Sequence, residues 1–319
     1  MRPFDISIFH HQETQLVIIE QIREDNLHPL IVRFFHNKLI GYGLAFLKNY
    51  SQHFTADFLF FKGGLPARYP IPWTGNFYLA EAWLMILGFC FLVSSGFRKK
   101  NLDYLLPIFW TIIGPLPAAL TFEDIPNLQR SSLMLPGLVM ITAYGLVELM
   151  KAVRPARLRK AILLLLTLAL AYNFAFFLHH YFHHSLTHQP WHRNYGEKEL
   201  IRSFQELSPQ YQRIVTTSYD DNQLIFYLFY TQFDPQVFQD LGSPRDKNFL
   251  TFQNLTYVYD HCPLKGDEKN EAEGELGVLY VNIGPCQLPK NAEKIRSIRR
   301  TDDTEAFQLV RLRYLKAKN

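Results

Sequence analysis

A few charged side chains stand beside long apolar stretches of this 319-residue sequence, and they are its clearest candidates for chemistry. Arg130 is the only basic residue in the stretch 122–130 (FEDIPNLQR), and Arg68 lies shortly before the first apolar run. A guanidinium stays charged and binds phosphate through two parallel hydrogen bonds. Both arginines are therefore candidates for binding a lipid phosphate. The alternative for each is an interface anchor, with Glu123 or Asp124 as the ion-pair partner of Arg130.

Four further side chains are weaker candidates for contact with a substrate. Asp57 is flanked by phenylalanines that would perturb its carboxylate, although a helix cap or a surface position is the simpler interpretation. Glu81 lies near one end of an apolar run, where a charge faces protein or water rather than lipid. Its alternative is a solvated interface position. His53 and Lys38 are included as loop contacts.

Six histidines crowd into the stretch 179–194 (HHYFHHSLTHQPWHRN). His180 and His184 are one helical turn apart, as metal ligands can be. No carboxylate or cysteine adjoins them, so an interfacial helix end with amphipathic His, Tyr and Trp side chains is the favoured interpretation. We therefore predict no cofactor, and the sequence gives no support for a divalent metal.

The sequence divides into an apolar middle and a charged final third, although its mean hydropathy of −0.08 is ordinary for a soluble protein. About 20 apolar residues cross a bilayer as a helix, and four runs qualify: 77–97, 104–122, 131–147 and 161–178. The second run contains three prolines, which neighbouring helices can accommodate. Four buried helices of a soluble protein are the alternative, but the last run alone strongly favours insertion.

Basic residues gather in two of the three loops between these runs. Residues 98–100 (RKK) follow the first run, and the loop after the third run contains Lys151, Arg154, Arg157, Arg159 and Lys160. The loop between the second and third runs contains one basic residue, Arg130. The positive-inside rule then places both basic loops in the cytoplasm. We predict a multi-pass protein of the plasma (inner) membrane with both ends extracytoplasmic.

The N-terminal segment raises a question of export. The start MRPFDISIFHHQE has no apolar core between a basic residue and a cleavage site, so it is not a signal peptide. Residues 1–72 would therefore form an extracytoplasmic loop region without an export signal of their own. Either the first span is a reverse anchor, or a complete protein has upstream spans that this chain lacks. The second explanation is favoured.

The final third predicts an extracytoplasmic α/β domain at 186–319, after a four-helix transmembrane region at 73–185. Its pattern indicates helices at 197–207 and 221–232, and strands at 213–219, 249–261, 276–284 and 307–315. A Cys262–Cys286 disulfide is expected on the oxidising side of the membrane, and two free thiols are the alternative. Cys90 is expected to be buried in the first span. The fold class is thus a polytopic α-helical membrane protein with a C-terminal α/β domain.

The stretch 37–64 (NKLIGYGLAFLKNYSQHFTADFLFFKGG), followed by Arg68, Gly75 and FYLAE at 77–81, resembles the middle of bacterial GT-C membrane glycosyltransferases. The branch concerned is related to protein mannosyltransferases and lipid A aminoarabinose transferases, which take a sugar from a polyprenyl-phosphate donor. The stretches 114–146 and 224–239 resemble the same proteins. The resemblance covers nearly the whole chain and matches the C-terminal part of such an enzyme.

The resemblance implies three partners: a polyprenyl-phosphate sugar, the lipid bilayer and an acceptor that is a protein, a lipid or a glycan. It places the stretch 49–64 in a loop over a membrane-embedded cavity. Such an enzyme needs a carboxylate to accept the acceptor's proton and cations to stabilise the departing phosphate, a role open to Arg68 and Arg130. The family's catalytic acidic residue lies in a first extracytoplasmic loop without a counterpart here. The catalytic residues are therefore unknown, and a missing N-terminal half is expected.

The chain also departs from the family pattern at two pairs of residues. Gly63-Gly64 stands where the family has Gly-Asp, and Arg68-Tyr69 stands where it has Arg-His. A non-catalytic membrane-anchored interaction module is consequently the second hypothesis. A transporter is the least favoured, because the spans show no internal repeat and no central charge. The net charge of +4 and the lack of a recognition motif argue against nucleic acid.

Overall fold

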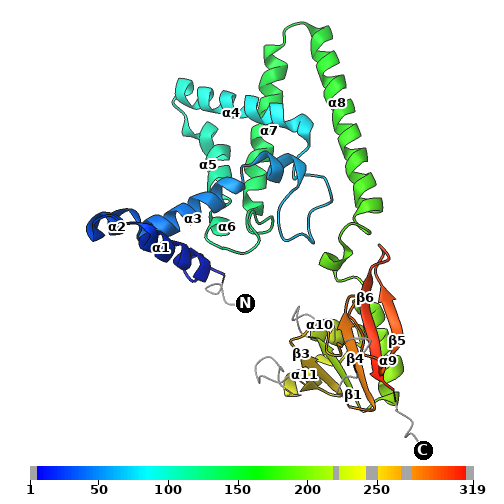
Figure 1. The fold of residues 1–319 in the computed structure, drawn as a ribbon. Coiled ribbons are helices and arrows are strands. Elements are labelled where there is room, and N and C mark those ends of the chain that lie inside the picture. The colour runs from blue at the N-terminus through cyan, green and yellow to red at the C-terminus, as the bar shows by residue number, and fades with distance from the viewer. Residues whose placement is uncertain (1–5, 218–222, 242–250, 267–269, 271–274, 314–319) are drawn as a thin grey trace, which may run out of the picture. The chain divides into compact units, whose positions relative to one another are not determined.

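The computed structural model describes residues 6–217, 223–241, 251–266, 270 and 275–313. The chain forms two compact units, Met1–Ser185 and Leu186–Asn319. The first unit is helical, and the second contains a six-stranded sheet with helices (Figure 1). The loop region and the transmembrane region expected at 1–72 and 73–185 lie together in the first unit.

Four segments of the first unit are helical and are long and apolar enough to cross a membrane, as predicted. They are Leu79–Lys99 (α4), Leu102–Ala119, Ser132–Ala152 and Ala156–His184. The second segment comprises Leu102–Leu105 (η2), Leu106–Ile113 (α5) and Leu116–Ala119 (α6). The third segment comprises Ser132–Met134 (η3) and Leu135–Ala152 (α7). The fourth segment comprises Ala156–His179 (α8) and the π-helix His180–His184 (η4). Helix α8 has no buried residue. An apolar helix with so little protein around it suits a hydrocarbon environment.

Helices α4 and α7 cross at glycines. A Cβ atom built on Gly88 would overlap the carbonyl oxygen of Ile141, and one built on Gly145 would overlap that of Leu84. Small residues allow such close backbone approach in membrane helix pairs. A Cβ atom built on Gly137 would likewise overlap the Thr111 hydroxyl of α5, so α7 also approaches α5 closely. The three helices therefore form one packed group.

Three helices precede this group: Gln12–Glu24 (α1), Pro29–Phe35 (α2) and Lys38–Gln52 (α3), followed by the short π-helix Asp57–Phe61 (η1). The resemblance implies a loop at 49–64. The structure instead ends α3 at Gln52 and places η1 in the following residues. Helix α3 has apolar residues repeating at helical spacing along one face, namely Leu39, Ile40, Leu44 and Leu47.

The segment 120–131, between α6 and η3, is the centre of what we call the loop layer: residues 6–11, 53–78 and 120–131. Ser7 pairs with Thr121 in an antiparallel bridge, and Leu65 pairs with Asn127 in a parallel one. The backbone hydrogen bonds include Leu65 N to Pro126 O at 2.8 Å and Leu128 N to Leu65 O at 2.9 Å. Three chain segments distant in sequence are thus joined at one end of the helices.

The second unit contains a mixed sheet in the order β2-β3-β1-β4-β6-β5. Its strands are Arg213–Thr217 (β1), Thr251–Phe252 (β2), Leu255–Val258 (β3), Val278–Ile283 (β4), Ala292–Arg299 (β5) and Glu305–Leu312 (β6), and its helices are Pro190–Arg193 (η5), Glu197–Leu207 (α9), Ser208–Gln210 (η6), Gln223–Tyr230 (α10) and Pro235–Leu241 (α11). Strand β1 pairs in parallel with β3 and β4, and the remaining pairs are antiparallel. Leu200 and Phe204 of α9 join Ile214 and Leu279 in the core.

Several sequence-based expectations need correction. The single strand expected at 249–261 is two strands within its described part, because the chain turns at Gln253, whose φ is +54°. Strand β5 and helix α11 were missed, since β5 is rich in charged residues, as edge strands often are. Cys90 is exposed rather than buried. The buried positions of α4 recur at Leu84, Gly88, Leu92 and Gly96, which leaves Cys90 on the outward side.

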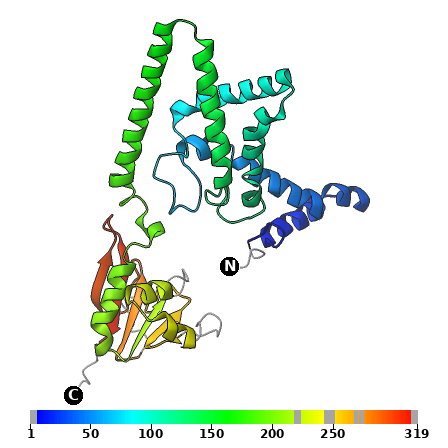
Figure 2. The same cartoon turned by 180° about the vertical axis from the view of Figure 1, so that it is seen from behind.

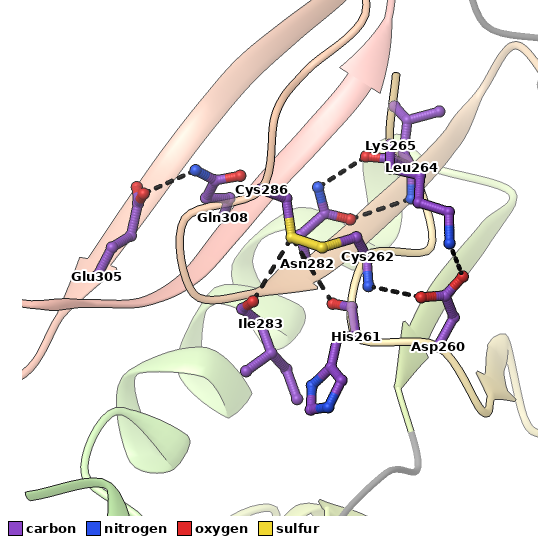
Figure 3. Close-up of a disulfide and its surroundings, with 10 residues drawn as sticks. All are labelled: Asp260, His261, Cys262, Leu264, Lys265, Asn282, Ile283, Cys286, Glu305 and Gln308. Carbon is purple, nitrogen blue, oxygen red and sulfur yellow. Dashed lines mark hydrogen bonds and ion pairs between the residues drawn. A yellow bond between two sulfur atoms is a disulfide. The ribbon is translucent and has the colours of Figure 1, made fainter. Parts of the chain in front are cut away.

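A disulfide joins Cys262 to Cys286, with the two Cα atoms 6.0 Å apart (Figure 3). Cys262 follows β3 and Cys286 follows β4, so the bond connects the ends of two strands that flank β1. The buried Asn282 side chain fixes the intervening loop, because it accepts from Leu264 N at 3.0 Å and donates to Leu264 O at 2.8 Å. The Asp260 carboxylate, two residues before Cys262, forms an ion pair with the Lys265 ammonium at 2.7 Å.

Replacing Gly88 by Leu should disrupt the crossing of α4 and α7. The new side chain would meet backbone atoms that cannot move aside, so the loss should reach ~3 kcal/mol or more. The measurement is thermal unfolding of the full chain in detergent. Gly43→Ala is the matched control, because no atom lies within 4 Å of a Cβ there. Equal unfolding temperatures for the two variants would contradict the packing.

Replacing both Cys262 and Cys286 by Ser should destabilise the second unit by about 3 kcal/mol, since the disulfide closes a long loop. Hydrogen exchange of β4 and β6 in the full chain measures this directly. Cys90→Ser, which breaks no disulfide, should leave exchange in these strands unchanged. Unaltered protection in the double variant would show that the disulfide contributes little.

Candidate functional site

Arg130 lies in the loop layer with its side chain 27% exposed. Its Nη1 donates to Thr121 Oγ1 at 2.8 Å and to the carbonyl oxygen of Glu123 at 3.2 Å. Its Nη2 is 4.0 Å from the Glu123 carboxylate, a long and weak ion pair. The guanidinium is therefore positioned by its own loop, and the side chain remains partly exposed. Glu123 is the ion-pair partner foreseen as the alternative to phosphate binding.

Arg68 lies three residues after Leu65, whose pairing with Asn127 joins this loop to the segment of Arg130. Its guanidinium carbon is 5.0 Å from the centre of the Tyr69 ring, a cation–π contact. Within the described residues Arg68 makes no ion pair, so its charge is uncompensated. The loop layer thus contains two arginines that retain capacity for an anion.

His53 is fully buried and acts inside the loop layer. Its Nδ1 donates to the carbonyl oxygen of Asn49 at 2.9 Å, and its Nε2 accepts from the backbone N–H of Asn127 at 3.0 Å. Burial removes the ring from water and lowers the pKa of His53, because the charged form loses its solvation. With both nitrogens engaged, His53 holds the segment 120–131 against α3 rather than contacting a substrate.

The two candidate carboxylates have local partners. Asp57 is 56% exposed and forms an ion pair with Lys62 at 2.6 Å. Glu81 accepts from the backbone N–H of Tyr78 at 2.8 Å and so caps the start of α4. Asp57 thus lies at the surface, and Glu81 has a helix-capping role that the sequence analysis did not assign to it. Lys38, at the start of α3, lines a shallow groove beside Ile8 and Leu120.

An apolar cavity of about 280 Å³ lies directly under the loop layer. Phe54 and Leu59 close it from the loop layer, and the helices contribute Met85, Ile86, Phe89, Ile108, Thr111, Ile112, Leu138 and Ile141. The Thr111 hydroxyl, the one polar side-chain group among them, already donates to the carbonyl oxygen of Pro107 at 2.8 Å. A cavity with no unsatisfied polar group suits a hydrocarbon chain and excludes a charged group.

A second cavity, of about 600 Å³, separates α1 from α3 and was not foreseen. Its lining is partly apolar and also includes His11, Glu13 and Lys48. The His11 ring stacks on Phe122 with centroids 4.0 Å apart. Gly41 and Ala45 of α3 line it, and the two helices touch where Ile18 of α1 lies against Gly41. This pair of small residues, four positions apart, is the sequence feature that marks the close approach of the two helices.

The histidine rings at the end of α8 contact one another, and two of them contact Trp73 edge to face. The Trp73 ring lies 5.6 Å from that of His180 and 5.4 Å from that of His184. His180 Nδ1 donates to the carbonyl oxygen of Phe176 at 2.9 Å. The part of the chain that the structure describes contains no group of three or more His, Cys, Asp or Glu side chains able to hold a metal ion. Because Trp73 belongs to the loop layer, its contacts with His180 and His184 join the end of the fourth apolar segment to that layer.

No protein-family model, curated protein or solved structure matches this chain. The likeness to GT-C glycosyltransferases stays a prediction from the residues.

Acidification should weaken the loop layer through His53. Because its pKa is lowered in the fold, its contribution to stability is present above about pH 6.5 and is lost as the pH falls through the folded-state pKa. We expect His53→Gln to flatten the decline in unfolding temperature between about pH 7.5 and about pH 5. His192→Gln, at an exposed position, is the control and should follow the unchanged protein. Parallel curves for all three proteins would contradict this role.

Proposed function

We propose that this chain is the C-terminal part of a membrane glycosyltransferase that transfers a sugar from a polyprenyl-phosphate donor to an extracytoplasmic acceptor. One observation carries the proposal: an apolar cavity among α4, α5 and α7 is closed by a loop layer that presents Arg68 and Arg130. Such an arrangement suits an amphiphile with a hydrocarbon tail and an anionic head.

The two ends of the donor would bind in different surroundings. Part of the polyprenyl tail would occupy the cavity, where Phe89 and Ile112 offer apolar contact. The phosphate cannot enter, because burying a charge without a partner is costly. It would remain at the loop layer, where the held guanidinium of Arg130 needs little reorganisation to bind it.

The reaction has simple requirements. The acceptor hydroxyl attacks the anomeric carbon, the bond from that carbon to the phosphate oxygen breaks, and its electron pair stays on the phosphate. The hydroxyl proton passes to a carboxylate. Arg68 and Arg130 would stabilise the phosphate charge. Asp57 and Glu81 are already engaged with Lys62 and the start of α4, so we propose that another segment of the enzyme supplies the base.

Binding tests the donor site itself. A polyprenyl phosphate should raise the unfolding temperature of the chain in nanodiscs, whereas the uncharged polyprenol should do so much less. Arg130→Gln and Arg68→Gln should each weaken binding by ~10-fold or more, as expected for losing a charge-assisted hydrogen bond. Arg23→Gln, in the last turn of α1, is the matched control. Equal responses to phosphate and alcohol would contradict the site.

Transfer tests the activity. Membranes containing this chain receive a radiolabelled polyprenyl-phosphate sugar, with and without the polypeptide encoded directly upstream. We expect transfer only with the upstream polypeptide, and its loss in the two arginine variants. Donor binding without transfer under both conditions would favour the non-catalytic interaction module. Transfer by this chain alone would show that the base lies among its own carboxylates.

A further inference from the structure

Helix α3 exposes one apolar face along its length. Leu39 is 85% exposed, Leu44 61% and Leu47 58%. The opposite face is packed, since Gly41 meets Ile18 of α1 and Asn49 donates to the carbonyl oxygen of Thr121 at 2.8 Å. The helix is therefore amphipathic with its apolar side turned outward. Within the described residues, nothing covers this face.

Helix α2, which directly precedes α3 in the chain, also exposes apolar side chains. Leu30 is 73% exposed and Phe34 70%, and Ile31 and Phe35 beside them are also exposed. Only Val32 is buried in this helix. So many large exposed apolar side chains on two successive helices mark an interaction site rather than a surface in contact with water.

The position of α3 indicates what covers the surface. Tyr50 follows Gly43 and Leu47 at helical spacing, so it belongs to the apolar side of α3. Its hydroxyl donates to the carbonyl oxygen of Ile112 in α5 at 2.8 Å. The apolar side of α3 therefore adjoins the outward surface of α5, where Phe109, Ile112 and Ile113 are exposed. Whatever covers α5 in a membrane also reaches α3.

Figures 1 and 2 show α3 running crosswise to α7 and α8, near the end of α7 that begins at Leu135. An amphipathic helix with cations beside its apolar side lies in the membrane interface, with the apolar side toward the acyl chains. The cations along α2 and α3 suit that place. Arg33, Lys38 and Lys48 form no ion pair within the described chain, and long basic side chains extend toward headgroups.

We propose that α1–α3 form an interfacial layer that lies on the bilayer, with α2 and the apolar face of α3 inserted among the outer acyl chains of anionic lipids. This proposal concerns the lipid surface and does not depend on the proposed transferase activity. A short helix rich in Leu, Ile and Phe provides the inserting residues, while Arg33, Lys38 and Lys48 contact anionic headgroups.

Fluorescence quenching in vesicles tests the insertion on the full chain. A Cys90→Ala background leaves no free thiol, because Cys262 and Cys286 are joined. Phe34→Cys and Leu44→Cys are labelled separately with an environment-sensitive fluorophore. Glu20→Cys, on the exposed polar side of α1, is the matched control. The vesicles contain phosphatidylglycerol and phosphatidylcholine, with brominated acyl chains in one series.

We expect brominated lipid to quench the labels at 34 and 44 at least ~2-fold more than the label at 20, and aqueous iodide to show the reverse order. If iodide quenched the labels at positions 34 and 44 as strongly as the label at position 20, the proposal would be overturned, because the surface would then face water. Quenching by neither agent would also overturn it, because a second copy or another protein would then cover the surface. Because no donor is present, failure here is distinct from failure of the transferase assay.

Discussion

A hydrogen bond from the backbone N–H of Asn127 to the buried ring of His53 organises the loop layer. Asn127 is 2% exposed, so its N–H would otherwise be buried without a partner, which costs roughly 1–3 kcal/mol. The same ring donates to the carbonyl oxygen of Asn49 and so ties the segment 120–131 to α3. Bridges to Ser7 and Leu65 then add the other two segments. Arg130 is positioned as a consequence.

The loop layer and the helices beneath it depend on each other. The glycine crossing of α4 and α7 brings their backbones together, and Gly137 does the same for α5 and α7. Because the close contacts lie where the glycines are, larger side chains such as Phe89 and Ile112 leave a cavity elsewhere between the helices. Phe54 and Leu59 of the loop layer close that cavity. The loop layer therefore combines the residues that border the cavity with the two arginines.

Hydropathy was sufficient to predict the four apolar helices, because length and composition alone decide whether a segment can cross a bilayer. It did not reveal the loop layer, whose key bonds join residues far apart: His53 and Asn127 are 74 positions apart, and Asn49 and Thr121 are 72. Such pairings depend on tertiary contacts that a single sequence does not display. The local partners of Arg130 and Asp57 were foreseeable, since Glu123 and Lys62 lie only seven and five residues away.

In the second unit, alternating or continuous apolar patterns revealed β1, β4 and β6, whereas the charged edge strand β5 showed no such pattern. The exposure of the Cys90 side chain is a second feature that the apolar pattern of the sequence did not predict. Its span was predicted, but which face of α4 meets α7 is set by Gly88 and Gly145 together. Hydropathy identifies helices that fit a membrane and carries less information about which sides of them touch.

Photo-crosslinking of a polyprenyl phosphate that carries a diazirine in its tail tests whether the cavity binds the donor. We expect mass spectrometry to find the crosslinks on the cavity-lining parts of α4, α5 and α7, around residues 85–89, 108–112 and 138–141. An unlabelled polyprenyl phosphate should compete for these sites, and polyprenol should compete poorly. Crosslinks confined to the outward face of α8, or unaffected by competitor, would show general contact with lipid and contradict a donor site.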